Sequence, residues 1–190
     1  MAVLRRRRTP LPAAARADLG LTPRERVLTA AQLADGRWVA ATTTALLVTT
    51  AAGPERHGWE SVDSAVWAEG ASMLQITWVG SSRSTLLEFA GSAGYLPEVV
   101  RERVEASVVL SRKISVRGSQ GVKIAVRRSG PGGGLITQVV PDRGVRIDEP
   151  EVAARIAFEL ADLRDATGMP ADEDWAPELP RLDSNQRPSD

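Results

Sequence analysis

Six basic residues between positions 112 and 128 could hold the phosphate groups of a nucleic acid or another anionic surface. The set consists of Arg112, Lys113, Arg117, Lys123, Arg127 and Arg128. Guanidinium and ammonium groups bind phosphate oxygens, which makes Arg127 and Arg128 the first contacts to test. Single-strand binders also stack bases on exposed aromatic rings, and this chain has only one Tyr and two Phe. A solvated face that pairs with Glu159, Asp162 and Asp165 on a predicted helix is therefore the favoured interpretation.

Candidates for catalysis are few. His57 is the only histidine, and Ser61, Asp63 and Ser64 follow it closely in the sequence. Nucleophilic catalysis needs a positioned serine with an oriented base, and no Gly-x-Ser-x-Gly motif occurs. A single histidine without any cysteine also argues against a zinc site. We therefore expect His57 to be a solvated loop residue, and we expect no catalytic residue, metal or cofactor.

Two further groups have simpler structural explanations. One is a glycine cluster, which consists of Gly130, Gly132, Gly133 and Gly134. A phosphate-binding loop would need a lysine and a following helix, whereas a β-type run follows here, so a hairpin loop is expected. The other group is acidic and consists of Asp148, Glu149 and Glu151. These residues surround the start of a predicted helix, where the macrodipole favours negative charge, so we interpret them as caps.

The composition is apolar-rich and electrically balanced. Of 190 residues 43% are hydrophobic, and 24 Lys or Arg stand against 24 Asp or Glu. The length suits one compact domain with a smaller appended unit, and the balanced charge gives no global attraction to nucleic acid or membrane. The chain has no cysteine, no signal-peptide pattern and no apolar run near the roughly 18–20 residues of a membrane span. We expect a cytoplasmic protein.

Residues 24–111 predict an antiparallel sheet followed by a helix. The expected strands cover residues 26–33, 37–41, 45–50, 61–68, 73–79 and 85–89, with a loop at 51–58. Asp35 and Gly36 accept positive φ and predict a hairpin turn. Val100, Val104 and Val108 recur every four residues, which predicts an amphipathic helix over residues 96–111 that covers the sheet. A strand at residues 108–109 stays open as an alternative.

Residues 112–168 predict a smaller sheet-plus-helix unit that packs on the first unit. Its strands are expected at residues 122–127, 135–140 and 145–147. Pro150 opens a helix with Gly168 as its C-cap. The apolar face of this helix consists of Val152, Ile156, Leu160 and Leu163.

The two ends of the chain are expected to lie outside these units. Residues 1–23 predict a flexible lead-in with one helical turn at 13–19, and residues 169–190 predict a disordered acidic tail. Residues 182–190 resemble a peptide translated antisense through a transfer RNA gene. We assign this segment no function.

A family resemblance rests on three features of residues 24–111. These are the hairpin arm Arg37, Trp38 and Val39, the step Gly58, Trp59, Glu60, Ser61 and Val62 into a later strand, and the closing helix. Together they resemble a bacterial pleckstrin-homology-like domain, which implies seven strands before the helix, of which the sequence places six. Closure of the barrel therefore stays open. Residues 110–128 are also similar to uncharacterised actinobacterial proteins, which implies no activity.

The resemblance implies a platform for proteins, peptides or lipid headgroups. Phosphate binding in the lipid-binding members uses a basic first hairpin. Here that hairpin has Arg24, Arg26 and Arg37 around the acidic Asp35, which is little positive charge for binding a phosphate. Lipid binding is therefore not expected. The tryptophans of this unit are Trp38, Trp59, Trp67 and Trp78, which we interpret as packing residues, although an exposed one would mark a partner site.

The sequence thus predicts an α+β protein: a partly closed antiparallel sheet capped by a helix, with a smaller sheet-plus-helix unit packed on it. The expected function is a non-enzymatic binding or scaffolding module for a protein partner, with peripheral membrane contact left open. Nucleic-acid or anionic-surface binding through the central basic cluster is the second hypothesis. An enzyme with an unrecognised site is the third.

Overall fold

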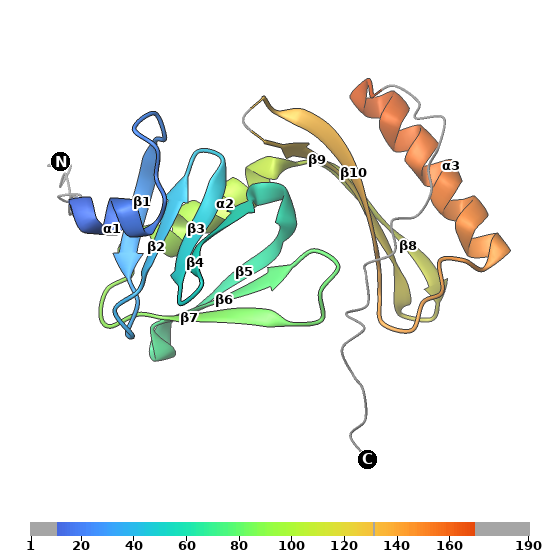
Figure 1. Cartoon of the computed structure of the whole chain (residues 1–190). Coiled ribbons are helices and arrows are strands. Elements are labelled where there is room, and N and C mark those ends of the chain that lie inside the picture. Colours follow the sequence, from blue (N-terminus) through green and yellow to red (C-terminus); the bar gives the residue numbers. More distant parts are fainter. Residues whose placement is uncertain (1–10, 131, 170–190) are drawn as a thin grey trace, which may run out of the picture.

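The computed structural model describes residues 11–130 and 132–169. The predictions for residues 1–10 and 170–190, including the segment 182–190, lie outside these described residues. A short helix, seven strands, a second helix, three further strands and a last helix follow one another along the chain (Figure 1). The strands form three antiparallel sheets without a closed barrel, so the mixed α+β prediction is confirmed.

The first sheet is a meander in which each strand pairs with the next. Its members are β1 (Val27–Gln32), β2 (Trp38–Thr42), β3 (Ala45–Thr50) and β4 (Gly53–Gly58). The predicted turn between β1 and β2 is confirmed, because Gly36 adopts φ +87° and its N–H donates to the Leu33 carbonyl.

The predicted loop at residues 51–58 is wrong, because most of it forms β4. Gly53–Gly58 pairs antiparallel with the apolar strand β3 along its whole length. The segment has little β propensity of its own, since Pro54, Glu55 and Arg56 fill its middle. Pairing with β3 and placement at the edge of the sheet, where proline is tolerated, explain why it is extended.

The second sheet completes a two-layer sandwich. It contains β5 (Val62–Ala68), β6 (Met73–Trp78) and β7 (Ser84–Glu88), with short 3-10 helices η1 (Trp59–Ser61) and η2 (Glu69–Ala71) before β5 and β6. A single antiparallel bridge between Leu33 and Phe89 joins the end of β1 to the end of β7. The two sheets are therefore connected along one side.

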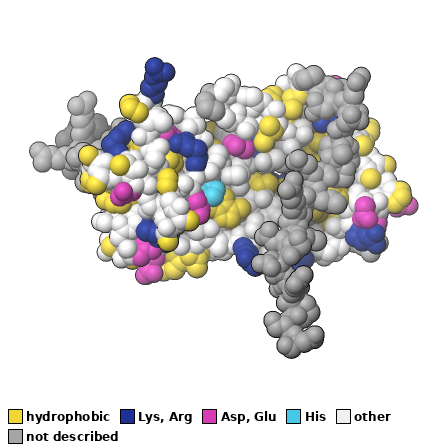
Figure 2. Space-filling model, in the orientation of Figure 1, with side chains coloured by type: hydrophobic (Ala, Val, Ile, Leu, Met, Phe, Trp, Pro, Cys, Tyr) yellow, Lys and Arg dark blue, Asp and Glu magenta, His cyan; other side chains and the backbone are white. Residues whose placement is uncertain are grey.

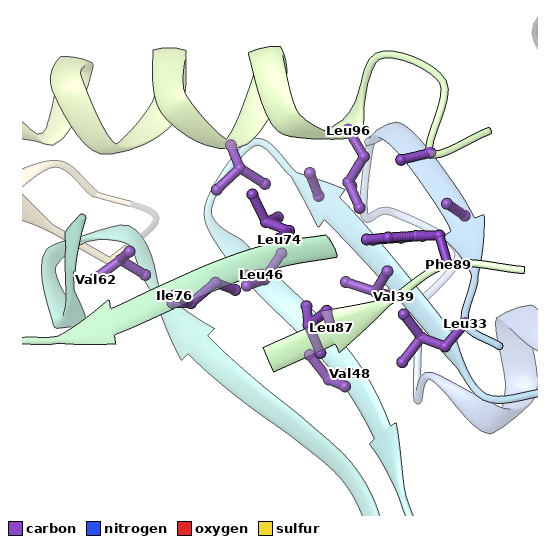
Figure 3. Close-up of a cluster of buried hydrophobic side chains, with 14 of the residues drawn as sticks. Leu33, Val39, Leu46, Val48, Val62, Leu74, Ile76, Leu87, Phe89 and Leu96 are labelled. Atoms are coloured by element: carbon purple, nitrogen blue, oxygen red, sulfur yellow. The ribbon is translucent and has the colours of Figure 1, made fainter. Parts of the chain in front are cut away.

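Helix α2 (Leu96–Ser107) closes one end of the sandwich. Figure 3 shows the helix above a core in which Leu46 and Val48 from the first sheet face Ile76 and Leu87 from the second. Leu96, Val100 and Val104 of the helix are buried in the same core. This arrangement confirms the predicted amphipathic helix.

The helix is shorter than predicted. It ends at Ser107, and β8 begins at Val108 without an intervening turn, which is the alternative that the valine-rich sequence left open. The Ser107 hydroxyl donates to the Val104 carbonyl at 2.6 Å, and Val108 already has extended dihedral angles. Because β-branched residues favour strands, the valines that follow continue as a strand.

The third sheet carries the last helix of the chain, α3 (Pro150–Thr167), on its outer face (Figure 1). The strand order is β10-β9-β8, with β8 (Val108–Arg117), β9 (Gln120–Ser129) and β10 (Gly134–Pro141). Helix α3 ends at Gly168, which has φ +68° as a C-cap. Its four predicted core residues, Val152, Ile156, Leu160 and Leu163, are all buried against this sheet, so that prediction is confirmed.

Two local predictions in this unit are wrong. Residues 145–147 form turn and irregular structure rather than a strand, and the ten-residue strand β8 had been predicted only at its start. Much of β8 alternates basic or hydroxyl residues with apolar ones, and pairing with β9 decides its conformation.

Part of the predicted lead-in packs on the first sheet. Helix α1 (Ala13–Asp18) precedes Leu19, which is fully buried against Ala40 and Leu47 on the face of the sheet that looks away from the main core. A second contact to this segment is ionic. Glu25 receives two hydrogen bonds of 2.7 Å from the guanidinium of Arg56 on β4. The N-terminal segment thus packs on β2 and β3 through Leu19 and is tied to the edge strand β4 through Glu25.

The Glu25 contact predicts a dependence of stability on pH. Hydrogen bonds from Arg56 hold the pKa of Glu25 below its ordinary value. The stabilisation is therefore complete above the unfolded-state pKa and is lost as the pH falls through the lower folded-state pKa. At pH 7 we expect Glu25→Gln to cost about 1 kcal/mol, since Arg56 is half exposed.

Urea unfolding between pH 7 and pH 3 would check this expectation. The wild type and the variant should converge toward acid pH, because the wild-type carboxylate becomes protonated there. Parallel stability curves at all pH values would contradict it.

Candidate functional site

A cavity of about 290 Å³ lies at the end of the sandwich that α2 leaves uncapped. Its floor is apolar and consists of Val48 on β3, Ile76 on β6 and Leu87 on β7. In Figure 3, Val48 and Leu87 lie at the end of the core remote from the helix. The cavity therefore lies over the end of the hydrophobic core that faces away from the helix, and its floor residues are themselves buried.

Polar side chains form the rim of the cavity. Glu55 and His57 on β4 pair with Val48 and Leu46, so they lie on the face of the sheet that bears the core residues. The His57 ring packs on the indole of Trp78, with ring centroids 4.2 Å apart and the planes tilted by 35°. The Trp78 Nε1–H donates to Thr85 Oγ1 at 2.9 Å. Figure 2 shows the histidine at the surface, beside an acidic and several hydrophobic side chains.

The polar groups of the rim have partners in the fold. His57 Nε2 lies 3.3 Å from Glu55 Oε2, and Arg37 Nε donates to Asp35 Oδ2 at 2.7 Å. This contact with Arg37 lowers the pKa of Asp35. A rim of this kind carries no strong excess of one charge, so it suits a ligand that is neither a phosphate nor a cation.

The prediction of His57 as a solvated loop residue is wrong. His57 lies in a strand, is partly buried and contacts an aromatic ring across the two sheets. Its sequence neighbours do not join it as catalytic groups, because the Ser61 hydroxyl donates to the Gly58 carbonyl and Asp63 pairs with Lys123. Ser61 and Asp63 therefore do not form a catalytic group with the imidazole of His57.

The prediction that the tryptophans of the first unit are packing residues is confirmed in part. Trp59 is buried and its Nε1–H donates to the Thr42 carbonyl, and Trp67 packs on Phe89 with centroids 5.7 Å apart. Trp78 instead combines packing with a place on the cavity rim. The sequence contained one signal for this site. Glu55 and His57 are two residues apart, so they lie on the same face if the segment is a strand, but the segment had been predicted as a loop.

The predicted basic cluster is dispersed over several ion pairs. Arg112 contacts Glu159 at 2.9 Å and Asp162 at 2.6 Å on α3, which is the pairing favoured from the sequence. Lys113 contacts Asp142 at 3.0 Å, and this contact lowers the pKa of Asp142. Arg117 lies at the end of β8.

Lys123 and Arg128 reach toward the first unit. Lys123 Nζ lies 2.6 Å from a carboxylate oxygen of Asp63, which belongs to β5. Arg128 is exposed and donates to the Ala106 carbonyl near the end of α2 at 3.4 Å. Both residues thus take part in the contact between the third sheet and the sandwich.

Arg127 is buried, so its prediction as a first contact for nucleic acid is wrong. Only 1% of the residue is exposed. Its Nη1 lies 2.7 Å from the Val62 carbonyl and 3.2 Å from the carbonyls of Trp59 and Glu60. Among the described residues no carboxylate lies within ion-pair distance of it, and burial lowers the pKa of the guanidinium. Arg127 therefore holds the third sheet against the start of β5.

A second cavity of about 300 Å³ lies at this junction. Its lining includes Thr43, Glu60, Arg103, Ser107 and Arg128. The last turn of α2 ends here, and carbonyl groups at a helix C-terminus favour cations such as arginine. Arg103 Nη2 donates to Glu102 and Arg128 Nη1 donates to the Ala106 carbonyl, so both arginines of the lining already contact groups of the fold.

The remaining two predicted groups have structural roles. Gly130 and Gly133 adopt φ +67° and +66° in the turn between β9 and β10, so the hairpin loop is confirmed. The expectation that the acidic group caps α3 is wrong in part. No side chain caps this helix by a hydrogen bond, and Asp148 pairs with Arg146 at 2.8 Å, whereas Glu151 lies in the first helical turn.

The described residues form neither a metal site nor a membrane-spanning helix. Within residues 11–130 and 132–169, no three acidic or histidine side chains gather as metal ligands. No helix in that part of the chain has the length and apolar character needed to span a bilayer. Comparison with protein families, curated proteins and solved structures found no match.

Proposed function

We propose that this protein is a non-enzymatic binding module for a protein partner, and that the partner contacts the open end of the sandwich. The observation that carries the proposal is the cavity between the sheets, whose floor of buried apolar residues lies beside the partly exposed Trp78 and His57. A pocket that can take a partner's side chain, inside a polar and aromatic rim, is typical of the anchoring points of protein contact sites. Balanced charge on the rim favours a protein over a polyanion.

The resemblance to pleckstrin-homology-like domains supports the same function. Seven strands precede α2, arranged as four and three, and the helix lies across one end of the sandwich. The strand that the sequence had not placed is β4. Platforms of that family carry protein and peptide ligands, so the proposed family and the proposed function are consistent.

The second hypothesis, binding of nucleic acid, has less support. Three of the six basic residues pair with carboxylates and one is buried. Each such contact competes with a phosphate for the same side chain. Proteins that bind nucleic acid need several available cations along one surface.

Affinity purification of the full-length tagged protein from its host, at low and high salt, would test the proposal. The wild type would be compared with Glu55→Lys, which changes an exposed charge on the rim, and with Thr85→Trp, which fills the mouth of the cavity. Phe158→Ser on α3 is the control, since Phe158 is 72% exposed and far from the cavity. Thermal melting would confirm that each variant is folded.

The proposal expects a protein that is recovered at both salt concentrations, lost with both rim variants and retained by the control. Two results would overturn it. One is recovery of nucleic acid alone, at low salt only. The other is a protein partner that both rim variants retain.

A further inference from the structure

The four outer strands of the sandwich differ in how their edges are covered. β1 and β7 meet through the Leu33–Phe89 bridge, and the Ala34 N–H donates to the Glu88 carbonyl at 2.9 Å. The start of β5 is covered by the third sheet, since its Val62 carbonyl accepts from Arg127. β4 pairs only with β3, and the later part of β5 pairs only with β6, so neither has a described strand on its other side. Of these two strands, only β4 lines the cavity.

The uncovered edge strand β4 is also a wall of the cavity. Glu55 and His57 of β4 line the cavity together with Trp78 and Thr85 from the second sheet. A chain that pairs with the free edge of β4 would therefore pass directly beside the opening. Alternate side chains of such a strand point to the same face, so one of them would face the gap between the sheets.

The size and charge of the cavity restrict what can enter it. A volume of about 290 Å³ is at the lower limit of small-molecule sites, which occupy about 300–1,000 Å³, but it accommodates one large side chain. The floor of Val48, Ile76 and Leu87 favours an apolar group. A charged side chain that reached this floor would lose its hydration among apolar groups, whereas Arg37 on the rim already donates to Asp35 and Glu55 already contacts His57.

Residues in the middle of β4 hinder the unselective addition of other strands to its edge. Pro54 supplies no N–H, and Glu55 and Arg56 place charges on the edge. Such residues reduce indiscriminate addition of strands. Selective addition then requires a further contact, which the cavity provides.

We propose that β4 and the cavity together bind an extended segment of the partner protein, which adds as a strand to β4 and inserts one uncharged apolar side chain between the sheets. This inference rests on the proposed function and specifies its ligand. Backbone hydrogen bonds would supply part of the affinity, and the inserted side chain would supply the specificity.

Selection of a phage-displayed library of random linear peptides on the full-length protein would test this mode. Enriched peptides should share an apolar residue at one fixed position, and replacing that residue by aspartate should weaken binding by about tenfold or more. Thr85→Trp should weaken binding similarly, while Phe158→Ser should not. In hydrogen exchange, bound peptide should slow the exchange of backbone amides in β4, which a ligand confined to the cavity would not do.

Separate outcomes distinguish this inference from the proposed function. If affinity purification yields a partner that depends on the rim, but peptides are not enriched or β4 amides remain unprotected, the strand-addition mode is overturned and the binding module stands. The same holds if the enriched peptides carry a shared charged residue in place of an apolar one. If Thr85→Trp leaves peptide binding unchanged while the variant remains folded, the cavity is not the binding site.

Discussion

Replacing Arg127 by methionine is expected to lower the free energy of unfolding by about 3 kcal/mol. The guanidinium is buried and its Nη1 donates to backbone carbonyls that include those of Val62 and Trp59. Methionine fills much of the same volume, but it leaves these carbonyls without their donor in a site with little access to water. Urea unfolding followed by circular dichroism would measure the loss.

Arg128→Met is a matched control, because it removes the same charge one residue further along β9. Arg128 is exposed and makes one long hydrogen bond, so its loss should cost no more than about 0.5 kcal/mol. Equal destabilisation by the two substitutions would show that net charge, and not the buried hydrogen bonds of Arg127, determines stability.

Leu160→Ala should destabilise the protein by a similar amount, about 3 kcal/mol. Leu160 is 2% exposed and lies in the core between α3 and the third sheet, together with Ile124, Val126 and Ile156. Removing two methyl groups and the methine carbon that bears them from such a small core leaves a cavity that neighbouring side chains cannot fill. Equilibrium unfolding in urea would provide the value.

Phe158→Ala tests the same helix on its solvent side. Phe158 is the larger residue, but it is 72% exposed, so its replacement should change stability by no more than about 0.5 kcal/mol. A larger effect for Phe158 than for Leu160 would contradict the placement of α3 on the sheet.

Elements with strong local patterns were predictable from the sequence. The apolar face of α3 repeats every three to four residues. The turn at Gly36 needs a positive φ, which glycine adopts more readily than other residues. Both signals are local, and both predictions are confirmed. The end of α2 was harder to place, because Val104 and Val108 continue a helical pattern although Val108 already belongs to a strand.

Residues whose environment depends on distant segments were not predictable. Pro54, Glu55 and Arg56 favour a loop by themselves and become a strand because β3 pairs with them. Arg127 was expected at the surface since arginine is rarely buried. Its burial depends on carbonyls about 65 residues earlier in the chain, which the sequence pattern does not identify. The candidate site was missed for the same reason, because its rim combines β4 with β6 and β7.

The strictly sequential strand order of all three sheets affects how the chain can fold. In each sheet every hydrogen-bonded neighbour is also the next strand in the sequence. Short loops close with little loss of chain entropy, so each meander can form from its own hairpins as synthesis proceeds. Contacts of long sequence separation, such as the Leu33–Phe89 bridge and the bond from Arg127 to Val62, then join sheets that have already formed. We therefore expect assembly of the sheets with one another, rather than formation of any one sheet, to limit the folding rate.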